Sequence, residues 1–250
     1  MFDIFVKYWW QFCLVAIVSY AIGNINFAVL FSRLIQKKDV RTCGSGNPGT
    51  TNMFRVFGLR MGVLTFACDS MKGVVCCLVS QWIFGVFNDP AAVTQVGYFA
   101  GLFAVLGHVF PAIYRFRGGK GVATAISVMF CMQPILMLCC VLPMIAVILV
   151  TDRMSAMSLL YAIFMIVWAW TMLLPSIGPF ACATITVMFA VVIFAHRHNI
   201  KRIFTGKEKR LGVRKALRGK SEHRLHELEE RKAKQLEKNE SDNNNDGNSR

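Results

Sequence analysis

Two glycine-rich segments of the chain carry the residue types that bind phosphate. The first runs from Gly44 to Asn52 (GSGNPGTTN) and is followed by Arg55, and the second runs from Gly118 to Gly121 (GGKG). Glycines permit left-handed turns that direct backbone N–H groups toward an anion, while Arg55 and Lys120 supply positive charge. The residues expected to contact a phosphate are glycines and short polar side chains: Gly44, Gly46, Asn47, Gly49, Thr51, Asn52, Gly118, Gly119 and Gly121. The sequence therefore predicts an anion site built from two loops, although a tight connector would also explain the first loop.

Two further pairs of polar residues lie where helices are expected to begin or end. Ser155 and Ser158 are three residues apart at the start of one helix, and His196 and Asn199 have the same spacing at the end of the last apolar helix. Each pair therefore shares a helix face. A histidine titrates near neutrality, which suits proton transfer. Helix capping or hydrogen bonding between helices would explain the two serines equally well.

Charged residues also occur inside an expected helix. Asp69 and Lys72 lie about one turn into the second apolar stretch, where charges are costly and are usually paired or functional. Their spacing predicts an ion pair that supports the site rather than reacts in it. His108 has two interpretations, one as a supporting residue of the site and one as a helix-end histidine without a catalytic part.

The composition is that of a membrane protein, with 55% apolar residues, 17% charged residues and a mean hydropathy of +0.47. Apolar stretches occur at about 10–34, 62–84, 96–114, 121–150, 156–174 and 178–195. A helix needs roughly 20 residues to cross the hydrocarbon core, and Gln133-Pro134 interrupts the fourth stretch, so we interpret 121–150 as two short helices. Positive residues mark the cytoplasmic side, and the segment 115–120, Arg153 and the tail are all basic. These observations predict an all-α polytopic membrane protein with seven transmembrane helices, its N-terminus outside and its C-terminus in the cytoplasm.

The net charge of +14 is concentrated at the C-terminal end, where residues 201–250 hold 15 of the 28 Lys and Arg. Because the other basic residues flank apolar stretches, we expect contact with anionic lipid headgroups and not with nucleic acid. We expect residues 1–205 to form a membrane-integral domain and residues 206–250 to form a largely disordered, charged tail in which 221–238 could be helical. The nine cysteines lie mostly in apolar stretches and predict packing residues, and the dispersed acidic residues predict neither a metal site nor a cofactor site.

Taken together, these segments resemble the integral-membrane acyl-phosphate:glycerol-3-phosphate acyltransferases of bacteria, the PlsY type. The resemblance rests on GSGNPGxTNxxR (44–55), DxxKG (69–73), GHxFP with GGKGVAT (107–124), SxxS (155–158) and HRxNI (196–200), and it covers about residues 10–205. It implies a seven-helix fold in the cytoplasmic (inner) membrane with an active site facing the cytoplasm. It also implies five catalytic residues, with Ser155 and Ser158 next to them in the site: Ser45, Arg55, Lys120, His196 and Asn199. The sequence departs from the family's usual Gly-Ser-Ile-Pro at Gly23-Asn24-Ile25-Asn26, which affects the bend of the first helix.

The implied reaction transfers an acyl group from acyl phosphate to the 1-hydroxyl of glycerol 3-phosphate, giving lysophosphatidate. The resemblance also implies contact with the soluble enzyme that makes acyl phosphate. Phosphate is a good leaving group, so no covalent enzyme intermediate is needed, and either His196 or a substrate phosphate oxygen takes the hydroxyl proton. Two alternatives stay open from the residues alone, a transporter for a phosphorylated solute and an acyl-CoA-dependent acyltransferase.

Overall fold

The computed structural model describes residues 2–86 and 90–212, and almost all of the regular structure in these ranges is helical. The α-helices are α1 (Phe2–Lys7), α2 (Trp9–Asn24), α3 (Phe27–Leu34), α4 (Thr50–Val86), α5 (Pro90–Val109), α6 (Val122–Met132), α7 (Pro134–Thr151), α8 (Met154–Trp168), α9 (Leu174–Ala195) and α10 (Arg197–Phe204). Two short 3₁₀ turns, η1 (Val40–Thr42) and η2 (Ala112–Tyr114), lie in loops, and a π-helical turn, η3 (Ala169–Leu173), follows α8. Residues 221–250, for which a helix and a disordered end were predicted, lie outside the described residues.

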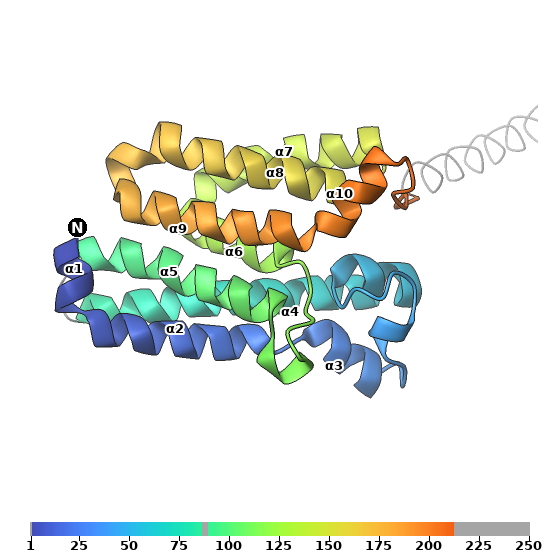
Figure 1. Ribbon diagram of the computed structural model, residues 1–250, viewed down its shortest axis with the longest axis horizontal. Coiled ribbons are helices and arrows are strands. Elements are labelled where there is room, and N and C mark those ends of the chain that lie inside the picture. The colour runs from blue at the N-terminus through green and yellow to red at the C-terminus, as the bar shows by residue number, and fades with distance from the viewer. Residues whose placement is uncertain (1, 87–89, 213–250) are drawn as a thin grey trace, which may run out of the picture. The chain divides into compact units, whose positions relative to one another are not determined.

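Five stretches of the described residues are long and apolar enough to cross a membrane: Trp9–Leu34, Thr50–Gly85, Ala92–Tyr114, Pro134–Thr151 and Met154–Ala195. The last of these contains both α8 and α9, which lie side by side (Figure 1). The break predicted at Gln133-Pro134 is confirmed, because α6 ends at Met132 and α7 begins at Pro134. With 11 residues, α6 is only about 17 Å long and cannot cross the hydrocarbon core by itself. The count of seven crossings stays a prediction.

The apolar stretch at 10–34 forms two helices, because the chain breaks between α2 and α3 at Ile25 and Asn26. The Asn26 side chain explains the restart: its Oδ1 accepts from the Val29 N–H at 2.9 Å, and its amide donates to the Pro48 carbonyl at 3.2 Å. A side chain that caps a helix start offsets the loss of backbone hydrogen bonds there. The same contact with Pro48 attaches the first glycine loop to the end of α2.

The fourth helix, α4, begins at Thr50, well before the apolar stretch predicted at 62–84. Its first two turns contain the polar residues of the glycine loop, so hydropathy alone does not mark them. A bend separates these turns from the rest of α4 at Gly58, where φ is 83°. The polar start of α4 and its membrane-buried part are therefore two helical segments in one element.

The fifth helix lies at the centre of the fold and packs against α2, α4, α6 and α9 (Figure 1). Its contact with α2 requires glycine on both sides, since a Cβ on Gly23 would collide with the Ala104 carbonyl and one on Gly107 would collide with the Tyr20 carbonyl. Such close approach fixes the end of α2 against the end of α5. The second glycine loop begins directly after that end.

A buried ion pair joins these helix ends. Lys72 Nζ lies 2.9 Å from Asp69 Oδ1, as the sequence spacing predicted, and both side chains are almost completely buried. The ammonium group also donates to the carbonyls of Ile25 at 2.8 Å and Gly23 at 3.4 Å, which the break after α2 leaves exposed. His108 Nδ1 lies 2.9 Å from the same ammonium group. Because an ammonium group only donates, Nδ1 accepts and the neutral ring carries its proton on Nε2.

The ion pair also reaches α6, because the backbone carbonyl of Asp69 accepts from Thr124 Oγ1 at 3.0 Å. Lys72 and Asp69 therefore connect α4 with the ends of α2 and α5 and with the start of α6. The loops that carry Ser45 and Lys120, and the start of α4 that carries Arg55, adjoin these places. The ion pair is confirmed, and the supporting role in the site stays a prediction.

We expect Lys72→Met to lower the free energy of unfolding by about 3–5 kcal/mol, because it leaves the Asp69 carboxylate buried without its partner. Asp69→Asn/Lys72→Met should recover most of this loss, since the double variant buries no charge. Thermal unfolding in detergent, followed by circular dichroism, measures both. A single variant as stable as the original protein would contradict the role of the pair.

Candidate active site

Separate segments of the chain meet at one end of the helices, where the predicted site residues lie (Figure 1). The contributing segments are the loop 35–49, the start of α4, the loop 110–121, the start of α8 and the chain from the end of α9 through α10 to Lys209. Several contacts tie them together: Gly119 lies against Pro48, Lys209 Nζ donates to the Gly44 carbonyl at 3.5 Å, and Glu208 joins Ser155 to Asn199. The two glycine loops thus lie at one face, as the sequence predicted.

In the first loop, the side chain of Asn52 holds the backbone in place. Its amide donates to the carbonyls of Val40 at 3.1 Å and Cys43 at 3.0 Å, and its Oδ1 accepts from the Ser45 N–H at 2.9 Å. Asn52 is buried, and a Cβ on Gly44 would collide with its Oδ1. The structure therefore places Asn52 beneath the loop as a brace, in contrast to the direct phosphate contact that was predicted for it.

The backbone of this loop differs in part from the predicted anion nest. Gly44 and Gly46 adopt left-handed φ values of 62° and 73°, whereas Gly49 has a φ outside that region. The N–H groups of Gly46 and Gly49 donate to the carbonyls of Cys43 and Asn47, both at 3.0 Å. Most of these donors are thus used inside the loop, because a tight turn satisfies its own backbone first. The Ser45 side chain stays exposed at the surface of the site.

The second loop shows a similar arrangement. The N–H groups of Gly118 and Gly119 donate to the carbonyls of Val109 at 3.2 Å and His108 at 3.1 Å. These bonds satisfy two carbonyls at the C-terminal end of α5. A Cβ on Gly119 would collide with the His108 ring and would lie 3.0 Å from the Pro48 carbonyl oxygen. Glycine is required here because it allows the two loops to touch over His108. His108 therefore supports both loops, which is one of the two interpretations that the sequence left open.

Lys120 is the cation that this packing presents to the site. Burial lowers the pKa of Lys120 to about 8, the charges of Arg202 and Arg55 act in the same direction, and Glu208 opposes them. Lys120 therefore lies within the electrostatic influence of Arg55, Arg202 and Glu208. Arg55 itself is exposed near the start of α4. The predicted anion site would draw its positive charge from these side chains.

His196 lies in the same region, at the junction of α9 and α10, and is 1% exposed. Its Nδ1 lies 2.8 Å from the Val192 carbonyl, so Nδ1 carries the proton in the neutral ring and Nε2 is left as an acceptor. Burial and the charge of Lys120 lower the pKa of His196 to about 4. The imidazole is therefore neutral at physiological pH.

The two serines of α8 have different surroundings. Ser158 Oγ donates to the Met154 carbonyl of its own helix at 2.9 Å, whereas Ser155 Oγ donates to Glu208 Oε1 at 2.5 Å. Asn199 Nδ2 donates to the same carboxylate oxygen at 2.7 Å. Ser155 and Asn199 are thus brought together, and Ser158 is directed back into its helix.

Two site residues were not predicted from the sequence. Arg202 lies three residues after Asn199 on α10, and this spacing could have indicated it. Glu208 lies in an irregular segment of the basic tail, where no sequence pattern indicates a contact with Ser155. Burial alone would raise the pKa of Glu208, but hydrogen bonds from Ser155 and Asn199 and the charge of Arg202 lower it overall.

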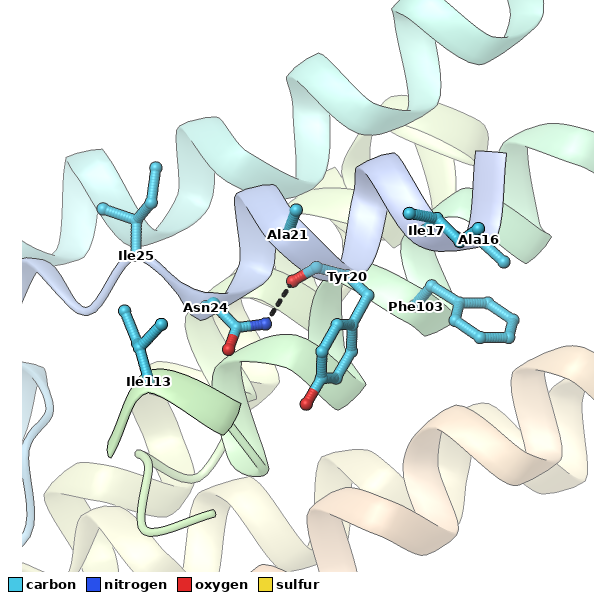
Figure 2. Close-up of a pocket in the computed structure, with 8 residues that line it drawn as sticks. All are labelled: Ala16, Ile17, Tyr20, Ala21, Asn24, Ile25, Phe103 and Ile113. Carbon is cyan, nitrogen blue, oxygen red and sulfur yellow. Dashed lines mark hydrogen bonds between the residues drawn. The ribbon is translucent and has the colours of Figure 1, made fainter. Parts of the chain in front are cut away.

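An apolar groove of about 550 Å³ lies along α2 and α5. Its walls include Ile17 and Tyr20 of α2, Phe103 of α5 and Ile113 of η2 (Figure 2). It is formed by other residues than the polar cluster. The groove can hold hydrocarbon, while the charged cluster can hold anions.

Comparison with known proteins identifies relatives of the chain. The family model described as glycerol-3-phosphate acyltransferase matches residues 13–206. The glycerol-3-phosphate acyltransferase of Clostridioides difficile is 36% identical over 209 residues, covering 82% of this chain and 98% of that protein. The protein of the same name from Pseudomonas paraeruginosa is 37% identical, with 78% and 97% covered.

Two solved structures have a similar fold. The crystal structure of PlsY, an integral membrane glycerol 3-phosphate acyltransferase, in its glycerol 3-phosphate form has a TM-score of 0.72 and 33% identity, and covers 82% of this chain and 98% of that one. Its lysophosphatidic acid form has a TM-score of 0.68 and 32% identity.

We expect the binding of inorganic phosphate to weaken as the pH rises through 8, because Lys120 loses its charge there. The dissociation constant should be roughly tenfold higher at pH 9 than at pH 7, since only the protonated amine attracts the anion. Lys120→Arg should remove this dependence between pH 7 and pH 9, because arginine stays charged. Isothermal titration calorimetry in detergent measures it. A dependence that is unchanged in Lys120→Arg would show that another group is responsible.

Proposed function

Because the chain belongs to the glycerol-3-phosphate acyltransferase family, we propose that it transfers an acyl group from acyl phosphate to the 1-hydroxyl of glycerol 3-phosphate. The products are 1-acyl-glycerol 3-phosphate and phosphate, and the reaction begins phospholipid synthesis. The observation that supports this proposal best is the meeting of Ser155, Asn199 and Arg202 on the Glu208 carboxylate, whose charge also acts on Lys120 and His196. The solved PlsY structures are named for their glycerol 3-phosphate and lysophosphatidic acid forms, which correspond to the acceptor and the product.

The site suits a reaction between two anions. Acyl phosphate and glycerol 3-phosphate repel each other, and Lys120, Arg55 and Arg202 offset that repulsion. Holding the hydroxyl next to the acyl carbonyl supplies much of the rate enhancement, because an intermolecular step becomes effectively intramolecular. Ser45, exposed on the first loop, is our candidate for the hydrogen bond to the developing oxyanion. Loss of one such donor typically costs about 10²–10³ in rate.

In the proposed reaction, the glycerol oxygen forms a bond to the acyl carbon, and the bond from that carbon to the phosphate oxygen breaks. The phosphate leaves with the bonding electrons, and the hydroxyl proton goes to a phosphate oxygen. We favour a phosphate oxygen over His196 because the pKa of His196 is lowered to about 4, whereas the second pKa of a phosphate monoester is about 6. His196 Nε2 accepts a hydrogen bond from the hydroxyl and orients it.

We propose that α2, α4, α5, α6, α7, α8 and α9 are the seven membrane helices, with α6 reaching only part of the membrane depth, and that the site faces the cytoplasm, with the N-terminus outside. This orientation follows the basic residues at the site end, which the positive-inside rule assigns to the cytoplasm. We place the end of the acyltransferase domain at Lys209, because Glu208 contacts Ser155 and Asn199. The anion site thus lies at the inner leaflet of the bacterial cytoplasmic membrane, and the apolar chain of the donor remains on the lipid side.

The experiment that tests the proposed function offers purified protein two donors. With glycerol 3-phosphate and palmitoyl phosphate in detergent, we expect lysophosphatidate to form, and with palmitoyl-CoA we expect at least tenfold less. Product is measured by mass spectrometry. A preference for palmitoyl-CoA would replace the proposed donor. No ester with either donor would contradict an acyltransferase and favour a transporter.

We expect His196→Ala to lower kcat by about 10–10³ and to leave the acid limb of the pH profile of kcat/KM unchanged, near the pKa of the substrate phosphate. The physical reason is that the variant loses a hydrogen bond to the hydroxyl but not the proton acceptor. The exposed neighbour His198→Ala serves as the control and should keep full activity. An acid limb near pH 4 that disappears in His196→Ala would identify His196 as the base instead.

A further inference from the structure

The second loop carries a short exposed segment between the end of α5 and its glycines. We call residues 112–117 (AIYRFR) the tip, which begins with η2 and ends with two arginines on either side of Phe116. Ile113 and Phe116 are 66% and 63% exposed, and Arg115 and Arg117 are also exposed. These four side chains add little to the core. The tip instead presents an apolar and basic surface to its surroundings.

The backbone of the tip is held in a conformation that leaves Phe116 exposed. Arg115 and Phe116 have left-handed φ values of 53° and 58°, and within residues 2–86 and 90–212 they are the only consecutive non-glycine residues with positive φ. Bulky side chains rarely adopt this conformation, because Cβ comes too close to the following carbonyl oxygen. Backbone hydrogen bonds from Phe116 to Pro111 at 2.9 Å and from Arg117 to Tyr114 at 3.2 Å maintain it. Strain that a fold maintains in this way is typical of functional segments.

The tip lies at one end of the apolar groove. Ile113 forms part of the groove wall, and Tyr20 Oη donates to the Phe110 carbonyl at 2.7 Å, which ties the chain before the tip to α2 (Figure 2). The groove lies along α2 and α5, which both belong to stretches long and apolar enough to cross a membrane, so it faces hydrocarbon. The stretch that contains α5 ends at Tyr114, directly before Arg115. The arginines of the tip therefore lie where hydrocarbon gives way to lipid headgroups.

The arginines of the tip find no negative partner within the fold. Among the carboxylates that the structure describes, none forms an ion pair with Arg115 or Arg117. Asp39 is already paired with Arg41 at 2.7 Å, and the Arg41 guanidinium lies over the Tyr114 ring at 5.4 Å. Two arginines next to exposed apolar side chains complement a lipid that has a negative phosphate and a hydrocarbon chain.

We propose that the tip anchors the second glycine loop to anionic phospholipid. Ile113 and Phe116 enter the inner leaflet, and the two arginines bind lipid phosphates. The choice of leaflet rests on the proposed orientation, whereas the lipid contact does not depend on acyl transfer. Because Lys120 lies three residues after the tip, the anchor holds its loop from the membrane side, while His108 supports the same loop from the helix side.

Phe116→Trp in lipid nanodiscs tests whether the tip enters the bilayer. We expect lipids brominated in the upper part of their chains to quench the fluorescence that this variant adds to that of the original protein, and aqueous iodide to quench it little. Tryptophan suits this position because its ring favours the membrane interface. Lys207→Trp, at an exposed position after α10, is the control and should show the opposite pattern. If iodide quenches the tryptophan at position 116 and brominated lipid does not, the tip lies in water and would suit a soluble partner, which would overturn the anchor.

The same variant measures the preference for charged lipid. In nanodiscs of phosphatidylcholine and phosphatidylglycerol, with bromine on one lipid at a time, we expect quenching to be about threefold stronger from brominated phosphatidylglycerol. Adding Arg115→Gln and Arg117→Gln should abolish this difference. Arg197→Gln with Lys201→Gln, which removes the same charge from α10, is the matched control and should preserve it. Thermal unfolding shows that each variant is folded.

Two results would overturn the preference for anionic lipid. Equal quenching by the two lipids before the arginines are changed would show that the tip does not select charge. Loss of the difference in the α10 control as well would assign it to the general charge of this end of the protein. Neither measurement uses an acyl donor, so an active protein with a water-exposed tip would keep the proposed reaction and overturn the anchor. An inactive protein with a lipid-bound tip would do the reverse.

Discussion

The contact between the two glycine loops depends on one buried ammonium group. Lys72 carries a positive charge among apolar helices, where it must find negative partners and acceptors. It finds them in Asp69, in the His108 ring and in the carbonyls of Gly23 and Ile25. The break between α2 and α3 is therefore part of the same arrangement, since an uninterrupted helix would use those carbonyls itself. His108, held by Lys72, then supports Gly119, and Gly119 brings the second loop against the first.

The glycines of the two loops thus act mainly through packing. Their N–H groups are largely used within the loops, while their missing side chains allow the loops to touch. In the proposed anion site, the side chains come from different elements: Arg55 from α4, Lys120 from the second loop, and Asn199 and Arg202 from α10. Cations placed close together repel one another, which is one reason why the pKa of Lys120 is lowered. The Glu208 carboxylate acts against that repulsion, because its charge raises the pKa of Lys120.

Local sequence patterns predicted what depends on nearby residues. The spacing of Asp69 and Lys72 predicted their ion pair, and Gln133-Pro134 predicted where α6 ends. The sequence also grouped the polar segments that meet at one end, because positive charge marks one membrane face. It marked the bend at 23–26 through the resemblance, but it did not indicate that Asn26 reaches Pro48 or that Glu208 contacts Ser155, 53 positions away. Contacts of this kind depend on the folded chain and leave no periodic signal. The brace formed by Asn52 is similar, since the residue type suits either a phosphate contact or a turn.

The bend at Gly58 allows Arg55 and the Asp69–Lys72 ion pair to be oriented independently, although both lie on α4. Asp69 lies 14 residues after Arg55, and in an ideal helix their side chains would point within about 40° of each other. In a straight helix, the direction in which Arg55 points from the helix axis would therefore be fixed by the direction of the Asp69 side chain. At Gly58 the backbone leaves the helical region, and no atom lies within 4 Å of where a Cβ would be. The glycine is there for its torsion angle alone. The direction of Arg55 is consequently set by Asn52 and the first loop. The segment of α4 after Gly58 can independently take the orientation that buries Lys72 and faces apolar residues to lipid.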